Sequence, residues 1–166
     1  VLRLQRRGHH EGQVGVEVPM KILTPLGRIL FSVLFITSGI SHFQYTDALT
    51  VAADGAGLPF PRASVLVSGA VILVGGILVL FGFAARIGAA MIAAFLVIAA
   101  LTVNDFWTYA DPQEAQAQMA HFMKNLAIAG GALLLVYFGP GPYSVDEARH
   151  AKAPGTLPLR ERRQEP

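Results

Sequence analysis

Four long apolar segments, separated by short polar stretches, dominate the pattern of residues along the chain. They cover residues 25–43, 62–84, 86–109 and 112–138. A helix needs about 20 mostly apolar residues to cross the hydrocarbon core of a bilayer, and each segment is about that long. Asp111 and Pro112 can cap and open the fourth helix, and the Gly-Pro repeat at residues 139–142 ends it. The pattern predicts an all-α integral membrane protein that folds as a four-helix bundle.

The composition supports this interpretation. Hydrophobic residues make up 53% of the chain and charged residues 14%, whereas a soluble domain carries about 25% charged residues because water must solvate its surface. The lipid bilayer is therefore the expected partner of most of the surface. The net charge of +2 does not indicate a nucleic-acid-binding protein, since the basic residues gather in the tails and short loops, as in other membrane proteins.

The positions of the basic residues predict an orientation. Of the 13 lysines and arginines, 11 lie in the tails, near the start of the first segment or between the second and third segments. Only Arg62 and Lys124 belong to the opposite side, which also carries acidic loops. The positive-inside rule then places both the N and C termini in the cytoplasm. Arg28, at the cytoplasmic end of the first segment, is interpreted as an anchor of this topology.

The two ends of the chain lack the apolar pattern. Residues 1–19 are polar and basic, so we expect a disordered N-terminal extension, with Met20 as the native start of translation. Residues 148–166 are rich in proline and charge and are expected to form a disordered basic tail. The membrane domain is thus expected to span residues 20–147.

The chain contains no cysteine. This excludes a structural disulfide, a thiolate-bound iron–sulfur cluster and a thiol relay within the chain. No phosphate-binding loop, dinucleotide fingerprint or nucleophile elbow is present either. Redox chemistry would therefore need a bound cofactor or a partner protein.

The clearest chemical signal is a polar stripe on the fourth segment. Glu114, Gln118, His121 and Asn125 are spaced so that they share one face of a helix. Polar groups within a membrane span usually face a bundle interior or a cavity. We expect His121 and Asn125 to form part of a buried site, and Glu114 and Gln118 only to mark where the helix leaves the membrane.

The predicted topology brings further polar residues to the same depth. The candidate site consists of His42, Trp107, His121, Lys124 and Asn125, with Asn104 and Asp105 as secondary members. Two histidines from different helices could ligate a b-type haem or hydrogen-bond a quinone, and spacing does not separate these ligands. A metal site at His42, His121 and Asp105 has weaker support, so none is predicted. As purely structural alternatives, Trp107 could belong to an interfacial aromatic belt and Asp105 could pair with Lys124.

Small residues in the predicted spans are expected to pack helices closely. Ser68, Gly75 and Gly82 recur every seven positions in the second segment, and the fourth contains Gly130-Gly131. Both sets are interpreted as packing faces without a catalytic role.

Several motifs at the predicted helix ends resemble those of the DoxX family of small bacterial membrane proteins. The matching stretches are residues 27–31, 38–43, 106–107, 121–131, 139–141 and 144–146. The resemblance covers about residues 20–147 and implies a four-helix protein of the bacterial plasma (inner) membrane. It also implies a link to quinone-dependent redox processes.

Three functions follow as expectations. The first is a subunit or accessory of a quinone-linked redox process, with the quinone in the outer-facing polar site. The second is a non-catalytic scaffold for a partner oxidoreductase, and self-association is a further partner hypothesis. The third is small-solute transport, which the lack of an internal repeat disfavours.

Overall fold

The computed structural model describes residues 20–151, and these form helices and connecting loops without a strand. The elements, in chain order, are η1 (Met20–Ile22), α1 (Leu23–Gln44), α2 (Thr46–Gly55), α3 (Pro61–Phe81), α4 (Ala85–Thr102), η2 (Phe106–Thr108), α5 (Pro112–Phe138) and α6 (Val145–Ala151). The expectations for residues 1–19 and 152–166 lie outside the described part of the chain.

Four of the described helices are long and apolar enough to cross a membrane. They are α1, α3, α5 and the segment Ala85–Thr108 that contains α4. Most of their large hydrophobic side chains are exposed on the outside of the protein, where only lipid could cover them without a large free-energy cost. The prediction of an all-α, multi-pass membrane protein is therefore confirmed, and its spans contact the lipid bilayer.

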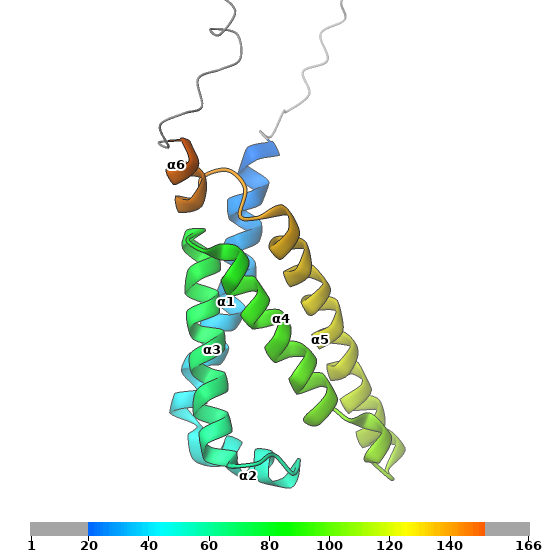
Figure 1. Ribbon diagram of the computed structural model, residues 1–166. Coiled ribbons are helices and arrows are strands. Elements are labelled where there is room, and N and C mark those ends of the chain that lie inside the picture. Colours follow the sequence, from blue (N-terminus) through cyan, green and yellow to red (C-terminus); the bar gives the residue numbers. More distant parts are fainter. Residues whose placement is uncertain (1–19, 152–166) are drawn as a thin grey trace, which may run out of the picture.

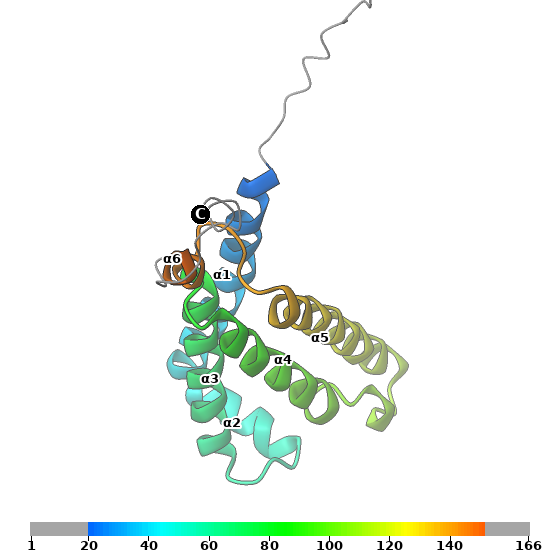
Figure 2. The ribbon, with the colours of Figure 1, turned by 45° about the horizontal axis from the view of Figure 1, so that its top comes forward.

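The helices are arranged so that one end of the molecule is narrow and the other is wide. α3 and α4 meet at the short turn between them and then diverge, with α1 beside α3 and α5 beside α4 (Figure 1). α6 lies at the narrow end, and α2 lies at the wide end below α3 (Figures 1 and 2). The core between the helices contains Phe35, Ile72, Val79, Ile92 and Leu96, together with several alanines.

The helix ends differ from the predicted ones where local conformation interrupts the apolar pattern. α3 ends at Phe81 because Gly82 adopts a left-handed conformation with a φ of 64°, which glycine tolerates without a Cβ clash. α4 ends at Thr102, although the apolar and aromatic residues that follow suggested a helix through Tyr109. α6 includes residues 148–151, so this part of the predicted disordered tail is helical. α2 was not predicted, because its ten residues are too few to be read as a span.

Glycines allow two pairs of helices to approach each other closely. A Cβ added to Gly88 of α4 would lie 2.7 Å from the carbonyl oxygen of Gly75 on α3. A Cβ added to Gly39 of α1 would lie 2.7 Å from Leu73 Cβ and 3.0 Å from the Gly69 carbonyl oxygen. Lipid provides little hydrophobic drive for helices to associate, so such close packing contributes directly to stability.

The other predicted packing positions behave differently. A Cβ on Gly130 or Gly131 of α5 would meet nothing within 4 Å, so the prediction that these glycines pack helices within the chain was wrong. Gly82 ends α3, and a Cβ added to it would overlap the side chains of Arg28 and Ser144. Sequence spacing identified small residues but could not show which face of each helix meets a neighbour.

Arg28 joins the start of α1 to the segment that follows α5. Its side chain is buried, and its Nη2 donates hydrogen bonds to the carbonyl oxygens of Tyr143 at 2.7 Å and Pro142 at 3.4 Å. A buried guanidinium is costly unless its donors are paired; here Nη2 is paired, whereas Nε and Nη1 are buried without a partner among residues 20–151. The interpretation of Arg28 as a simple topology anchor was therefore incomplete, because the residue holds two distant parts of the chain together.

Asp146 completes this junction from the start of α6. Its Oδ1 accepts a hydrogen bond from Ala84 N at 2.9 Å, and its Oδ2 accepts one from Ala85 N at 3.2 Å. Its own backbone N donates to the Gly82 carbonyl oxygen at 2.9 Å. Ala84 cannot cap α4 with a side chain, so Asp146 supplies the cap and a negative charge at the helix N-terminus. We call the contacts of Arg28 and Asp146 with their partners the latch.

Gly88→Ala should destabilise the fold, because the new Cβ would overlap the Gly75 backbone. Overpacking of this kind costs about 1–3 kcal/mol. Gly130→Ala is the matched control on an open helix face and should cost nothing, since alanine favours helix by up to about 1 kcal/mol over glycine. Denaturant unfolding in detergent, followed by far-UV circular dichroism, measures both. Equal stability of the two variants would refute the packing role of Gly88.

Arg28→Met should release the segment that follows α5 from the latch. Hydrogen bonds to charged groups contribute about 1.5–3 kcal/mol, so amide exchange at Ala84, Ala85 and Asp146 should accelerate by about tenfold or more. Lys21→Met, at an exposed position near the same end, is the control. Hydrogen exchange followed by mass spectrometry gives the rates. Unchanged exchange in Arg28→Met would mean that Arg28 does not hold the latch.

Candidate functional site

Asn104 connects the loop after α4 to α5. Its Nδ2 donates to Gln118 Oε1 at 2.8 Å, and its Oδ1 accepts from Asn125 Nδ2 at 2.9 Å. All three side chains are half-buried. Of the polar stripe on α5, Gln118 and Asn125 therefore face the loop after α4. The sequence had predicted that His121 and Asn125 would be the buried pair. The amide chain orders the connection at the wide end.

His121 lies on an exposed face of α5, so the prediction that it is buried was wrong. Lys124, one helical turn further on, places its Nζ 3.1 Å from His121 Nδ1. The four-residue spacing places His121 and Asn125 on the same broad face of α5. The helix is rotated so that Asn125 is half-buried, whereas His121 is exposed. Glu114 is also exposed.

Trp107 and Asp105 belong to the wide end without contacting the histidines. The Trp107 ring packs edge-on against Phe122, with the ring centres 5.9 Å apart, and Phe106 packs against both. Trp107 is 56% exposed, as expected of an aromatic residue at a membrane interface. Arg62 and Asp47 form the ion pair found within residues 20–151, so the alternative pairing of Asp105 with Lys124 is not formed there.

His42 lies apart from the other candidates, where α1 passes α3. Its Nδ1 is 2.8 Å from the carbonyl oxygen of Ser38, and its ring packs edge-on against Phe95 of α4. A Cβ on Gly69 of α3 would lie 2.6 Å from His42 Cβ, so the glycine makes room for the histidine. His42 therefore lines the space between α3 and α4, whereas His121 lies on α5 beyond α4. The two histidines do not form the predicted pair.

The donor sets proposed for haem and metal are likewise separated. In residues 20–151, His, Asp and Glu side chains form no group of three or more that could hold a metal ion. The weaker option of a metal at His42, His121 and Asp105 is therefore not supported by the arrangement of these residues.

A cleft of about 610 Å³ lies near the wide end between α3 and α4. Its lining is mostly apolar. It consists of His42, Leu49, Ala52, Ala53, Leu58, Ser64, Val65, Val67, Ser68, Val71, Met91, Ala94, Phe95, Ile98, Ala99, Thr102, Val103 and Asn104. Of the predicted site residues, His42 and Asn104 line the cleft, whereas Trp107, His121, Lys124, Asn125 and Asp105 do not.

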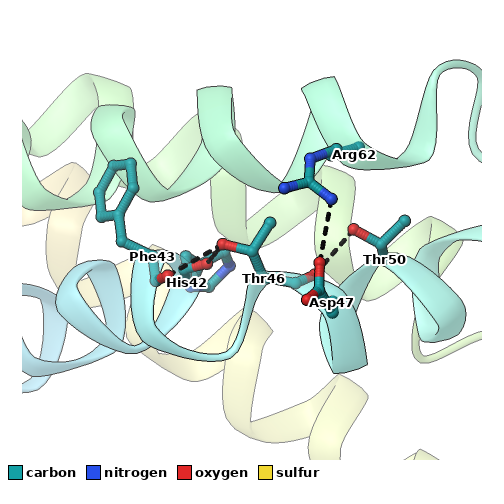
Figure 3. A network of polar contacts seen from close by, with 6 residues as sticks. All are labelled: His42, Phe43, Thr46, Asp47, Thr50 and Arg62. Carbon is teal, nitrogen blue, oxygen red and sulfur yellow. Dashed lines mark hydrogen bonds and ion pairs between the residues drawn. The ribbon is translucent and has the colours of Figure 1, made fainter.

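α2 closes the cleft at the wide end. Arg62 of α3 pairs with Asp47 of α2 at 2.9 Å (Figure 3). Thr46 donates to the carbonyl oxygen of His42 at 2.8 Å, and Thr50 donates to that of Thr46 at 2.7 Å (Figure 3). The ion pair is exposed and contributes at most about 1 kcal/mol. α2 is thus attached mainly by packing on α3.

A second cavity, of about 750 Å³, lies at the narrow end beside the latch. Arg86, Asp146 and Glu147 are its charged lining residues. The Asp146 carboxylate already accepts two backbone hydrogen bonds there. This cavity is therefore a feature of the junction between helices, and the apolar cleft is the stronger candidate for ligand binding.

Comparison with known proteins gives a consistent family. The SURF4 family matches residues 17–152. The Escherichia coli inner membrane protein YqjF is 36% identical over 140 residues, which cover 80% of this chain and 99% of that protein. The Saccharomyces cerevisiae ER-derived vesicles protein ERV29 is 27% identical over 123 residues, or 74% of this chain and 32% of that protein.

A fission yeast relative extends the same similarity. The Surfeit locus protein 4 homolog of Schizosaccharomyces pombe is 37% identical over 75 residues, or 43% of this chain and 24% of that protein. The chain thus matches nearly all of YqjF but at most a third of these two yeast relatives. No solved structure is significantly similar to the chain.

These matches correct the resemblance to the DoxX family, which was wrong. The expectations that depended on it, a quinone-linked redox role and an association with oxidoreductases, are withdrawn. The structure explains why the motifs were misleading. Residues 144–146 form the latch, and Gly39 and Gly139 lie at a helix crossing and a helix end. Residues at such positions are determined by helix packing and helix ends, and different families of membrane proteins have these features in common.

Asn104→Ala should loosen the loop between α4 and α5, because it removes both hydrogen bonds of the amide chain. Each bond contributes about 0.5–1.5 kcal/mol, and Gln118 and Asn125 lose a partner. His121→Ala, at an exposed position, should be neutral. Hydrogen exchange of residues 103–111 measures the effect. Equal exchange in the two variants would contradict a structural role for Asn104.

Proposed function

The chain belongs to the SURF4 family, and from this membership and the cleft we propose that it is an inner-membrane protein that binds the apolar chain of a membrane lipid. The observation that carries the proposal is the cleft itself. Its volume of about 610 Å³ lies within the range of about 300–1,000 Å³ that is usual for small-molecule sites. The role is binding, and a catalysed reaction is not part of the proposal.

The position of the cleft favours a lipid over a water-soluble ligand. α3 and α4, which form its two sides, are both candidate membrane spans. Apolar walls at membrane depth are poorly matched by water, and lipid chains are the molecules that reach them. Ala94 of α4 lines the cleft and is exposed, and Val67 of α3 is 63% exposed. A lipid chain can therefore contact both helices at once.

The polar groups of the lining favour binding over catalysis. Ser64 donates to the Pro59 carbonyl oxygen, Ser68 to that of Val65 and Thr102 to that of Ile98. A hydroxyl nucleophile needs a base within hydrogen-bond reach, whereas these hydroxyls are bonded to backbone carbonyls. The lining thus supplies shape and apolar surface.

The orientation of the protein and its location in the inner membrane also belong to this proposal. The positive-inside rule supports the narrow end on the cytoplasmic side and the cleft in the outer half of the membrane. The name of YqjF places that relative in an inner membrane. Self-association also remains a prediction, and the open helix face at Gly130 and Gly131 is compatible with it.

A second candidate is a membrane receptor that holds an apolar segment of another protein. One yeast relative, ERV29, is named for ER-derived vesicles. The chain matches 32% of ERV29 and 24% of the Schizosaccharomyces pombe relative. The roles of these longer proteins therefore do not transfer directly to this chain. The same cleft would then hold a peptide in place of a lipid chain.

Ala94→Trp should expel the bound lipid, because the indole ring would fill part of the cleft. Ala90→Trp is the matched control, since Ala90 is exposed on α4 but does not line the cleft. Native mass spectrometry of protein released from lipid nanodiscs should show lipid retained by the wild type and Ala90→Trp and lost from Ala94→Trp. Equal retention by all three would refute the proposal, and a co-purifying peptide that Ala94→Trp loses would favour the receptor.

A further inference from the structure

We propose that the cleft selects an uncharged lipid with a free hydroxyl group, which donates a hydrogen bond to Nε2 of His42. The inference rests on the proposed function, since it names the class of lipid that the cleft would hold. It follows from the hydrogen bonds already made by the polar groups of the lining.

The hydrogen bond at Nδ1 determines the tautomer of His42. Nδ1 lies 2.8 Å from the carbonyl oxygen of Ser38. A carbonyl oxygen can only accept, so Nδ1 must carry the hydrogen. In the neutral ring, Nε2 then has a lone pair and acts as an acceptor.

Nε2 is available to a ligand. The His42 ring lines the cleft, and none of the hydrogen bonds found among the described residues uses Nε2. The buried side-chain nitrogen and oxygen atoms without a partner in this part of the chain belong to Arg28 and Ser32. The half-buried His42 is not among them, so Nε2 is not enclosed by protein, and the residue that carries it lines the cleft.

The position of the ring is fixed by packing. Gly69 admits the Cβ of His42 against α3, and Phe95 contacts the ring edge from α4. With Nδ1 tied to the backbone as well, the ring has little freedom to turn. A preorganised acceptor of this kind binds a donor at a smaller entropy cost, because its own side chain is already ordered.

Most of the remaining polar groups of the cleft already use their donors, and Asn104 keeps one N–H of its amide. The side-chain NH₂ of Asn104 donates to Gln118, and its oxygen accepts from Asn125. The hydroxyls of Ser64, Ser68 and Thr102 donate to backbone carbonyls and keep only acceptor capacity. A ligand whose polar end is an ester or ketone could accept only from this second N–H of Asn104 and would leave His42 Nε2 unpaired, whereas a hydroxyl can donate to Nε2.

Charge narrows the class further. Among the described residues that line the cleft there is no lysine, arginine, aspartate or glutamate. A phosphate or carboxylate head group placed there would lack a counter-ion at membrane depth, which is costly. The chemistry that fits is a neutral lipid alcohol, such as a long-chain or isoprenoid alcohol.

The test compares two probes that differ only in the donor, 1-hexadecanol and hexadecyl methyl ether. Each displaces tritiated hexadecanol from wild-type protein in nanodiscs. Wild type should prefer the alcohol by about two- to tenfold, which corresponds to one net hydrogen bond. His42→Phe should bind both probes equally, with the ether affinity kept. The exposed-site variant His121→Phe should keep the preference.

The outcomes separate the inference from the proposed function. Equal binding of both probes to wild type, or a preference that persists in His42→Phe, would overturn the role of His42 while leaving the lipid cleft intact. Displacement that Ala94→Trp does not weaken would overturn the cleft itself. The wild-type comparison needs no variant, so the inference is tested even if His42→Phe fails to fold.

Discussion

The structure depends on the latch, where the segment after α5 docks onto the turn between α3 and α4. Asp146 caps α4 from outside that helix, and Arg28 binds the carbonyl oxygens of Pro142 and Tyr143. These contacts bring α1, α3, α4 and the end of α5 together at one end of the molecule. A buried charged group without partners is expensive, and Nη2 of Arg28 and both carboxylate oxygens of Asp146 are paired here. The latch therefore adds directional contacts to the apolar packing at the narrow end.

A fixed narrow end leaves the wide end free to diverge. The close contacts at Gly75 and Gly88 hold α3 against α4, and those at Gly39 and Gly69 hold α1 against α3. Beyond the α3–α4 contact the side chains do not fill the space between the helices, and the cleft opens there. α2 closes its outer end, and the amide chain of Asn104 holds the neighbouring loop to α5. The cleft is thus a consequence of how the helices cross.

The sequence predicted the membrane spans but not the site, and the physical reason differs for each. Spans follow from hydropathy and length, and the cap at Asp111, which accepts from Gln113 N, follows from local chemistry. Helix rotation is set by distant contacts, so His121 and Gly130 were assigned to the wrong faces. Arg28 gave no sign of burial, because its partners lie more than a hundred residues away. No sequence motif indicates the cleft, because the alanines and valines that line it cannot be distinguished in the sequence from residues of a packed core.

The most direct test of the central claim asks whether lipid fills the cleft. The chain has no cysteine, so Ala99→Cys in the cleft and Leu134→Cys on the exposed face of α5 can each carry one fluorophore. The probes are read in bilayers of lipids brominated along the acyl chain, and then with aqueous iodide. We expect bromine to quench the probe at residue 99 about as strongly as the lipid-facing probe at residue 134. Quenching at residue 99 by iodide but not by bromine would show a water-filled cleft and contradict the account.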